Sequence, residues 1–246
     1  MSARVVAVYS TKGGVGKTTT AVNLAWQAAS EGSPVLLWDL DPQASATWLL
    51  DVKQKLRGGA DALVHGRTSA ERAIRESRFP RIDVLPADES YRDLDIALDA
   101  GKKSESRIAA TLKPLRRDYD VIVLDCPPGA SLVATNALNA ADVVVLPVVP
   151  SALSLRSIAQ VRQLLAAADG RTPVVAFLNQ VDRRKLAHRV AAESLPAADP
   201  DMSDIVVPAS VVVERMGERR APLGEYAPTA ETTRAFAGLW NRIKRS

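Results

Sequence analysis

The chain has 246 residues, of which 47% are hydrophobic, 24% charged and 4% aromatic. This is the composition of a globular protein, and it excludes a disordered, collagen-like or disulfide-stapled chain. Basic residues exceed acidic residues by four, which permits an anionic partner without requiring one. The single cysteine, Cys126, cannot form an internal disulfide, and no run approaches the roughly eighteen apolar residues of a membrane-spanning helix, so we expect a cytoplasmic protein.

Short β-branched apolar runs alternate along the chain with longer segments rich in Ala and Leu. The predicted strands are 5–9, 35–38, 82–85, 121–124, 143–149, 174–178 and 205–207. The predicted helices are 18–31, 69–78, 105–117, 131–140, 153–168 and a tail from about 229. This order predicts an α/β fold with a doubly wound, mainly parallel sheet that binds ligands at the carboxyl ends of its strands. We expect residues 1–246 to form one domain, with 51–67 as an irregular surface excursion and 195–200 as a Pro-rich stretch in a looser part of the pattern.

A glycine-rich loop follows the first predicted strand and precedes a helix. Its sequence is Ser10-Thr11-Lys12-Gly13-Gly14-Val15-Gly16-Lys17-Thr18-Thr19. Glycines allow backbone N–H groups to surround phosphate oxygens, and the helix N-terminus adds positive potential. Lys17 would neutralise the β- and γ-phosphates, and the Thr18 hydroxyl would bind magnesium. The loop therefore predicts a site for ATP or GTP with Mg²⁺.

The loop departs from the plain P-loop pattern at one position, because Thr11 stands where the first glycine is expected. Together with the extra Lys12, this departure resembles the deviant Walker A motif of the ParA/MinD family. The resemblance implies a P-loop ATPase that forms an ATP-bound homodimer, in which this lysine reaches the nucleotide of the partner subunit. The nucleotide-binding residues that it implies are Lys12, Gly13, Gly14, Val15, Gly16, Lys17, Thr18 and Thr19.

Two predicted strands end in carboxylates. The sequence Asp39-Leu40-Asp41-Pro42-Gln43 follows the predicted strand 35–38, and the sequence Asp125-Cys126-Pro127-Pro128-Gly129 follows the predicted strand 121–124. Alternation places Asp39 and Asp41 on one side of an extended segment, and carboxylates beside a triphosphate require magnesium between them. Taken alone, either segment would be only a strand-ending turn.

Both segments also resemble the switch I and switch II motifs of the same family. The match implies that Asp41 positions the attacking water, that Asp39 holds a magnesium-bound water and that Asp125 is the Walker B carboxylate. Lys12, Lys17 and Asp41 are then the catalytic residues, and Thr18, Asp39 and Asp125 serve the metal. The implied reaction is hydrolysis of ATP to ADP and phosphate, slow until a second subunit and a stimulating protein complete the site.

Weaker signals lie outside these motifs. Asn179 matches the position of a base-contacting asparagine in the family, with a strand-end cap as its alternative role, and Pro208 lies in a segment that resembles the family's second adenine-side segment. Cys126 is expected to be a small buried residue, because the two histidines, His65 and His188, lie far from it in sequence. Two isolated histidines do not make a metal site.

Basic residues cluster in the last third of the chain. Arg183, Arg184, Lys185 and Arg189 form one cluster, and Arg215, Arg219 and Arg220 form a second. A solvated helix face is the alternative for each cluster. ParA-type relatives bind nonspecific DNA through this region, which requires only phosphate contacts. Val212 replaces an arginine often found there, so the DNA-binding set is expected among Arg183, Arg184, Lys185, Arg189, Arg215 and Arg219.

The C-terminal tail supports a competing hypothesis. Phe236, Leu239, Trp240 and Ile243 form one apolar stripe with basic neighbours. MinD-type relatives place such a helix on membranes. The other interpretation, which we prefer, is a terminal helix packed on the sheet.

The resemblance covers nearly the whole chain and is closest to small ParA-type partition ATPases. It implies a cytoplasmic, nucleoid-associated homodimer whose hydrolysis is stimulated by a cargo-bound protein, with no operator-reading domain. The cargo would be a plasmid, a chromosome region, a protein cluster or a microcompartment. An ATP-dependent metal-cofactor carrier of the same superfamily is the remaining alternative, but such carriers use a cysteine pair, and this chain has one cysteine.

Overall fold

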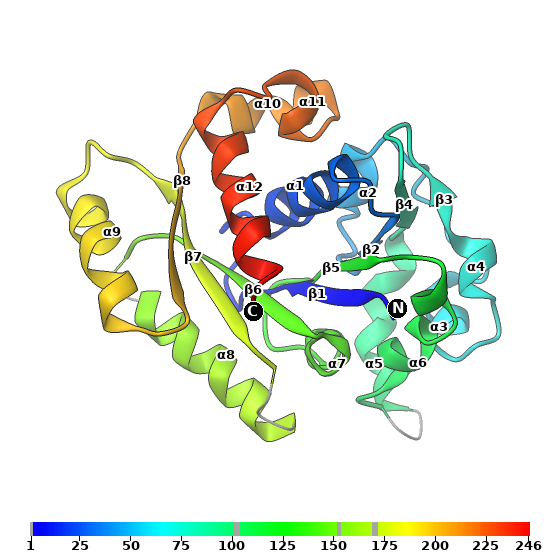
Figure 1. Cartoon of the computed structure of the whole chain (residues 1–246). Helices are drawn as coiled ribbons and strands as arrows, with labels where there is room; N and C mark the ends of the chain where they lie inside the picture. The colour runs from blue at the N-terminus through cyan, green and yellow to red at the C-terminus, as the bar shows by residue number, and fades with distance from the viewer. Residues whose placement is uncertain (1, 101–103, 152–153, 169–171) are drawn as a thin grey trace.

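The strands form one mainly parallel sheet. A computed structural model describes residues 2–100, 104–151, 154–168 and 172–246, and within them the sheet has eight strands in the order β3-β4-β2-β5-β1-β6-β7-β8 (Figure 1). All neighbouring strands are parallel except β3 and β4. Their bounds are β1 Arg4–Val8, β2 Val35–Asp39, β3 Arg75–Glu76, β4 Ile82–Leu85, β5 Val121–Asp125, β6 Val143–Val148, β7 Val174–Val181 and β8 Met202–Pro208. The predicted doubly wound α/β sheet is confirmed.

Helices cover both faces of the sheet (Figure 1). One face carries α1 (Lys17–Ser30), α2 (Ser45–Leu49), α10 (Val211–Arg219), α11 (Leu223–Tyr226) and α12 (Glu231–Ile243). The other carries α3 (Gly59–Val64), α4 (Ala70–Ala73), η1 (Glu89–Asp93), α5 (Leu94–Asp99), α6 (Arg107–Leu112), η2 (Leu115–Arg117), α7 (Leu132–Ala140), α8 (Ser154–Ala168) and α9 (Leu186–Ala198). Alternate residues of each strand enter opposite cores, so the central strands are apolar throughout.

Two predicted crossover helices are shorter than expected. The segment 69–78 contains only α4, after which the chain becomes extended at Ile74 and adds β3 to the edge of the sheet. Phe79 is buried before the chain re-enters the sheet in β4, and Pro80 disfavours helical geometry in the residue before it. The segment 105–117 splits into α6 and η2, because Pro114 lacks the N–H that a continuous helix needs.

Two segments expected to be irregular are helical. The excursion at 51–67 contains α3, which buries Ala60, Leu63 and Val64. The Pro-rich stretch at 195–200 is helical in its first part, because α9 continues through Pro196 and ends at Ala198. Residue 153, the predicted start of the helix at 153–168, lies outside the described residues, and α8 begins at Ser154.

The apolar stripe of the C-terminal helix is buried. Phe236, Leu239 and Ile243 are 0% exposed, and Trp240 is 3% exposed. The indole Nε1 of Trp240 donates to Glu31 at the end of α1 at 2.9 Å, and Lys244 donates to the same carboxylate at 2.8 Å, which lowers the pKa of Glu31. The stripe therefore belongs to the core, as expected for a docked terminal helix. No helix of the described residues has the length and apolar character needed to cross a membrane.

This docking predicts a large loss of stability in Trp240→Ala. Truncation of a buried tryptophan should lower the free energy of unfolding by about 3–5 kcal/mol, measured by urea denaturation with circular dichroism. Asn241→Ala, on the exposed side of α12, should change it by less than about 0.5 kcal/mol. Equal, small effects of both substitutions would show that the helix is not held on the sheet.

Candidate nucleotide-binding site

The loop between β1 and α1 requires glycine at two positions. Gly14 and Gly16 have φ angles of +71° and +88°, in the left-handed region that side chains disfavour. A Cβ atom at Gly16 would lie 2.4 Å from the amide nitrogen of Asn179, so no larger residue fits there. Helix α1 begins directly after Gly16, which leaves its N-terminal N–H groups facing the loop.

Lys17 is held over this loop from the first position of α1. Its side chain is 7% exposed, and its Nζ donates to the carbonyl oxygen of Lys12 at 3.1 Å. Burial lowers the pKa of Lys17, although the charges of Asp125 and Asp41 partly offset the effect. Lys12 itself is half-buried and lines a cavity of about 320 Å³ on the far side of the loop.

The sheet register places two carboxylates side by side. Asp39 and Asp125 are paired residues of the adjacent strands β2 and β5, and both side chains are 0% exposed. Asp39 accepts bonds from the backbone N–H and the hydroxyl of Thr47, both at 2.8 Å, and from the N–H of Asp41 at 3.2 Å. Neither oxygen of Asp125 has a hydrogen bond of normal geometry within the described residues.

Burial dominates the electrostatics of this pair. It raises the pKa of Asp39 to about 6, despite the bonds from Thr47. It raises the pKa of Asp125 well above its usual range, and the neighbouring Asp39 adds to the effect while the nearby Thr18 hydroxyl partly offsets it. Two adjacent buried carboxylates, one of them without a hydrogen bond of normal geometry, are costly, and such a pair indicates the place of a cation.

The donor set fits a magnesium ion that arrives with phosphates. Among the described residues, no group of three or more His, Cys, Asp and Glu side chains could hold a metal ion by itself. Mg²⁺ does not need such a group, because it keeps several waters and is held by one or two carboxylates together with substrate phosphates. The Thr18 hydroxyl and the carboxylates of Asp39 and Asp125 supply such a set.

Both switch segments contact this centre. The partly exposed Asp41 follows β2, and its carboxylate accepts the N–H of Gln43 at 2.9 Å. Gly129, with φ +90°, donates from its N–H to Thr11 at 3.1 Å and accepts the hydroxyl of Tyr9 at 3.0 Å. The structure therefore brings Asp41 and the segment after Asp125 to the same edge of the sheet as the glycine loop.

A cavity of about 470 Å³ opens beside the loop, between the ends of β7 and β8. Gly16, Thr19, Asn179 and Pro208 are among its lining residues, so the two predicted base-side positions do lie together. The amide of Asn179 donates to the carbonyl oxygen of Val15 at 2.7 Å. Asn179 thus braces the glycine loop from the side, a role beyond the strand-end cap.

Two residues of the site were not predicted from the sequence. Thr47 in α2 fixes Asp39, and its spacing of eight residues carries no recognisable pattern. Gln180 donates its side-chain amide to Gly14 at 2.8 Å from a backbone with φ +57°. The only sequence signal for Gln180 is that it follows Asn179.

The predicted DNA-binding residues fall on two elements. Arg183, Arg184, Lys185 and Arg189 lie in the turn before α9 and in its first turn, and Arg215 and Arg219 lie on α10. Arg183 forms an ion pair with Glu231 and Arg184 pairs with Asp182 at 2.9 Å, whereas Arg189 donates to the carbonyl oxygen of Arg183 at 2.9 Å. All six side chains are exposed.

The amino-acid sequence is similar to those of known proteins over most of its length. A family model described as an AAA domain matches residues 3–172, more than half of the chain. The chromosome partitioning protein ParA of Myxococcus xanthus is 32% identical, over 98% of this chain and 88% of the relative. The chain belongs to the ParA family. The chromosome partitioning protein ParA of Caulobacter vibrioides is 31% identical, over 98% of this chain and 93% of the relative.

A solved structure shares the fold over nearly the whole chain. The solved ATP complex of Cyanothece McdA has a TM-score of 0.87 and 19% identity, and it covers 98% of this chain and 96% of its own. At that identity the likeness shows the fold alone. The family is one of partition and positioning ATPases, so the resemblance expected from the loop and switch motifs is confirmed.

The burial of Asp125 beside Asp39 predicts that Asp125 lowers the stability of the free protein but is needed for the binding of ATP with Mg²⁺. At pH 7, Asp125→Asn should raise the free energy of unfolding of the nucleotide-free protein by roughly 1–3 kcal/mol, because it removes a carboxyl group whose ionisation burial disfavours. It should also abolish the magnesium-dependent rise in melting temperature that ATP produces. The matched change Asp204→Asn, at an exposed position of β8, should do neither. A destabilised Asp125→Asn protein that still responds to ATP with Mg²⁺ would contradict this account.

Proposed function

We propose that this ParA-family protein binds ATP with Mg²⁺, closes into a homodimer, and hydrolyses ATP slowly until a cargo-bound protein stimulates it. The observation that carries the proposal is the buried pair of Asp39 and Asp125 beside Lys17 and the glycine loop. A cation held by these carboxylates and an anion on the loop would relieve the cost of burying the charges. A magnesium nucleotide supplies both.

The reaction requires positioning and charge neutralisation by the chain's own residues. The loop N–H groups and Lys17 hold the phosphates, and Asp41 orients water for in-line attack on the γ-phosphorus. The bond to the β–γ bridging oxygen breaks, and the water proton is accepted at the Asp41 carboxylate or passed to phosphate. Thr18, Asp39 and Asp125 would hold a magnesium ion, which when bound would neutralise charge on the phosphates. Lys12 of the partner subunit completes the charge neutralisation in the closed dimer.

Asp41→Ala tests this division of roles. Without the group that orients water, hydrolysis should fall by at least about 100-fold, in the range of general-base contributions. Binding should persist, so the variant should remain an ATP-dependent dimer in size-exclusion chromatography with light scattering. Lys12→Ala and Lys17→Ala should both abolish hydrolysis. Turnover at the wild-type rate in Asp41→Ala would refute the assignment.

We propose that the dimer binds nonspecific DNA. The exposed arginines before α9 are held by surface ion pairs, which are weak enough for phosphates to displace. Phosphate contacts of this kind need no base reading. The competing lipid surface would require the apolar stripe of α12, which is buried. Relatives that carry the name of chromosome partitioning proteins support DNA as the track, and hence a cytoplasmic, nucleoid-associated protein.

Charge reversal of Arg183, Arg184 and Arg189 to Glu should remove ATP-dependent DNA retardation. The slope of log affinity against log salt should fall by about 0.9 for each phosphate that the protein no longer neutralises. ATP-dependent dimerisation should be unchanged, because these side chains lie outside the phosphate site.

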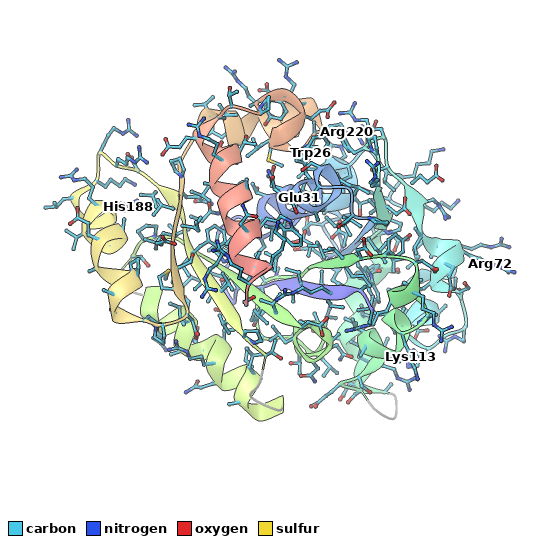
Figure 2. All side chains as sticks on the ribbon, viewed as in Figure 1. Trp26, Glu31, Arg72, Lys113, His188 and Arg220 are labelled. Carbon is cyan, nitrogen blue, oxygen red and sulfur yellow. The ribbon has the colours of Figure 1, made fainter. Side chains whose placement is uncertain are left out.

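Three exposed cations at the other end of the molecule provide the control. Arg72 and Lys113 lie at the edge opposite α9 in Figure 2, and Arg75 is in β3. Their reversal gives the same net charge and should leave DNA binding intact. Equal loss in both triple variants would assign the effect to net charge and not to a site.

A further inference from the structure

The wall of the base-side cavity carries a histidine with no role in the site described so far. His188 lies in the first turn of α9, beside the ends of β7 and β8 (Figures 1 and 2), and its side chain lines the cavity. It is 9% exposed, and Asn179, at 4%, is the other buried polar side chain among the cavity's lining residues. The Asn179 amide already donates to the glycine loop.

One hydrogen bond fixes the tautomer of His188. Its Nδ1 accepts the backbone N–H of Asp182 at 3.0 Å, so Nδ1 carries a lone pair and the neutral ring has its proton on Nε2. The carboxylate of Asp182 is paired with Arg184 and does not compete for the ring. The imidazole is thus held at Nδ1 by the residue that follows β7, and its other nitrogen, Nε2, carries an N–H donor.

We propose that Nε2–H of His188 donates a hydrogen bond to a ring nitrogen of the nucleotide base, which makes His188 a base-binding residue. This inference rests on the proposed nucleotide function of the adjacent loop. Adenine presents ring nitrogens as acceptors, and the cavity continues from Gly16 and Thr19, at the phosphate end, to His188. Phosphate contacts cannot distinguish one nucleoside from another, so a directed donor in this wall contributes selectivity.

Two amide substitutions separate this role from a purely structural one. Asn can present an oxygen near the position of Nδ1 but nothing at Nε2, so His188→Asn keeps the bond to Asp182 and loses the donor. Gln can present an amide nitrogen near Nε2 but no acceptor at Nδ1, so His188→Gln keeps the donor. A neutral hydrogen bond has a modest net value, which corresponds to roughly a fivefold to tenfold change in affinity.

The test is isothermal titration of the full chain with ATP and Mg²⁺. We expect a Kd about fivefold to tenfold weaker for His188→Asn, and within about twofold of wild type for His188→Gln. Thermal unfolding without nucleotide confirms that each variant is folded. Wild-type affinity in His188→Asn, or equal losses in both variants, would overturn the proposal and leave His188 as a structural residue.

Titration with deaza analogues of ATP identifies which ring nitrogen of adenine accepts the hydrogen bond from His188. Wild type should bind one of 1-deaza-, 3-deaza- and 7-deaza-ATP about fivefold to tenfold more weakly than ATP, and His188→Asn should bind that analogue and ATP equally. Equal wild-type affinity for all three analogues and ATP would overturn the base contact. Absence of any ATP binding by wild type would instead refute the proposed function, so the two failures are distinguishable.

Discussion

Mutual repulsion of two buried carboxylates is the constraint on which the site depends. The parallel register of β2 and β5 fixes Asp39 beside Asp125, and neither can move to water without breaking the sheet. Asp39 is held by Thr47 and Asp41, whereas Asp125 lacks a hydrogen bond of normal geometry in the described part of the chain. The fold therefore bears an electrostatic cost that a bound cation relieves, and functional sites commonly reduce the stability of the free protein in this way.

The remaining elements of the site are arranged around this centre by backbone contacts. Asn179 and Gln180 brace the glycine loop from the end of β7, and Gly129 joins switch II to Thr11. On the other side, α2 contributes Thr47 to Asp39, and the Trp48 carbonyl oxygen accepts the Arg220 guanidinium from the end of α10 at 3.1 Å. The short helix α2 is thus in contact with both the carboxylate centre and the helix that carries Arg215 and Arg219.

The sequence predicts the central sheet and the glycine loop of this protein better than its peripheral helices. The central strands are identifiable because burial on both faces makes them continuously apolar, and the glycine loop is identifiable because phosphate binding restricts its residues. Helices that depend on tertiary contacts are harder to predict, as α3 and the interrupted segment around Pro114 illustrate. Thr47 and His188 act through contacts that only the folded chain creates, from α2 and α9. Local sequence around an isolated histidine does not reveal a cavity wall.

Calorimetric titration of the wild-type protein tests the central claim most directly. Three titrations are compared: Mg²⁺ alone, ATP with EDTA, and ATP with Mg²⁺. Asp39 and Asp125 do not form a complete metal site by themselves, and they would repel ATP phosphates on the loop unless Mg²⁺ shields their charge. We therefore expect strong binding only when ATP and Mg²⁺ are present together. Equally tight ATP binding in EDTA, or tight binding of Mg²⁺ alone, would contradict the account.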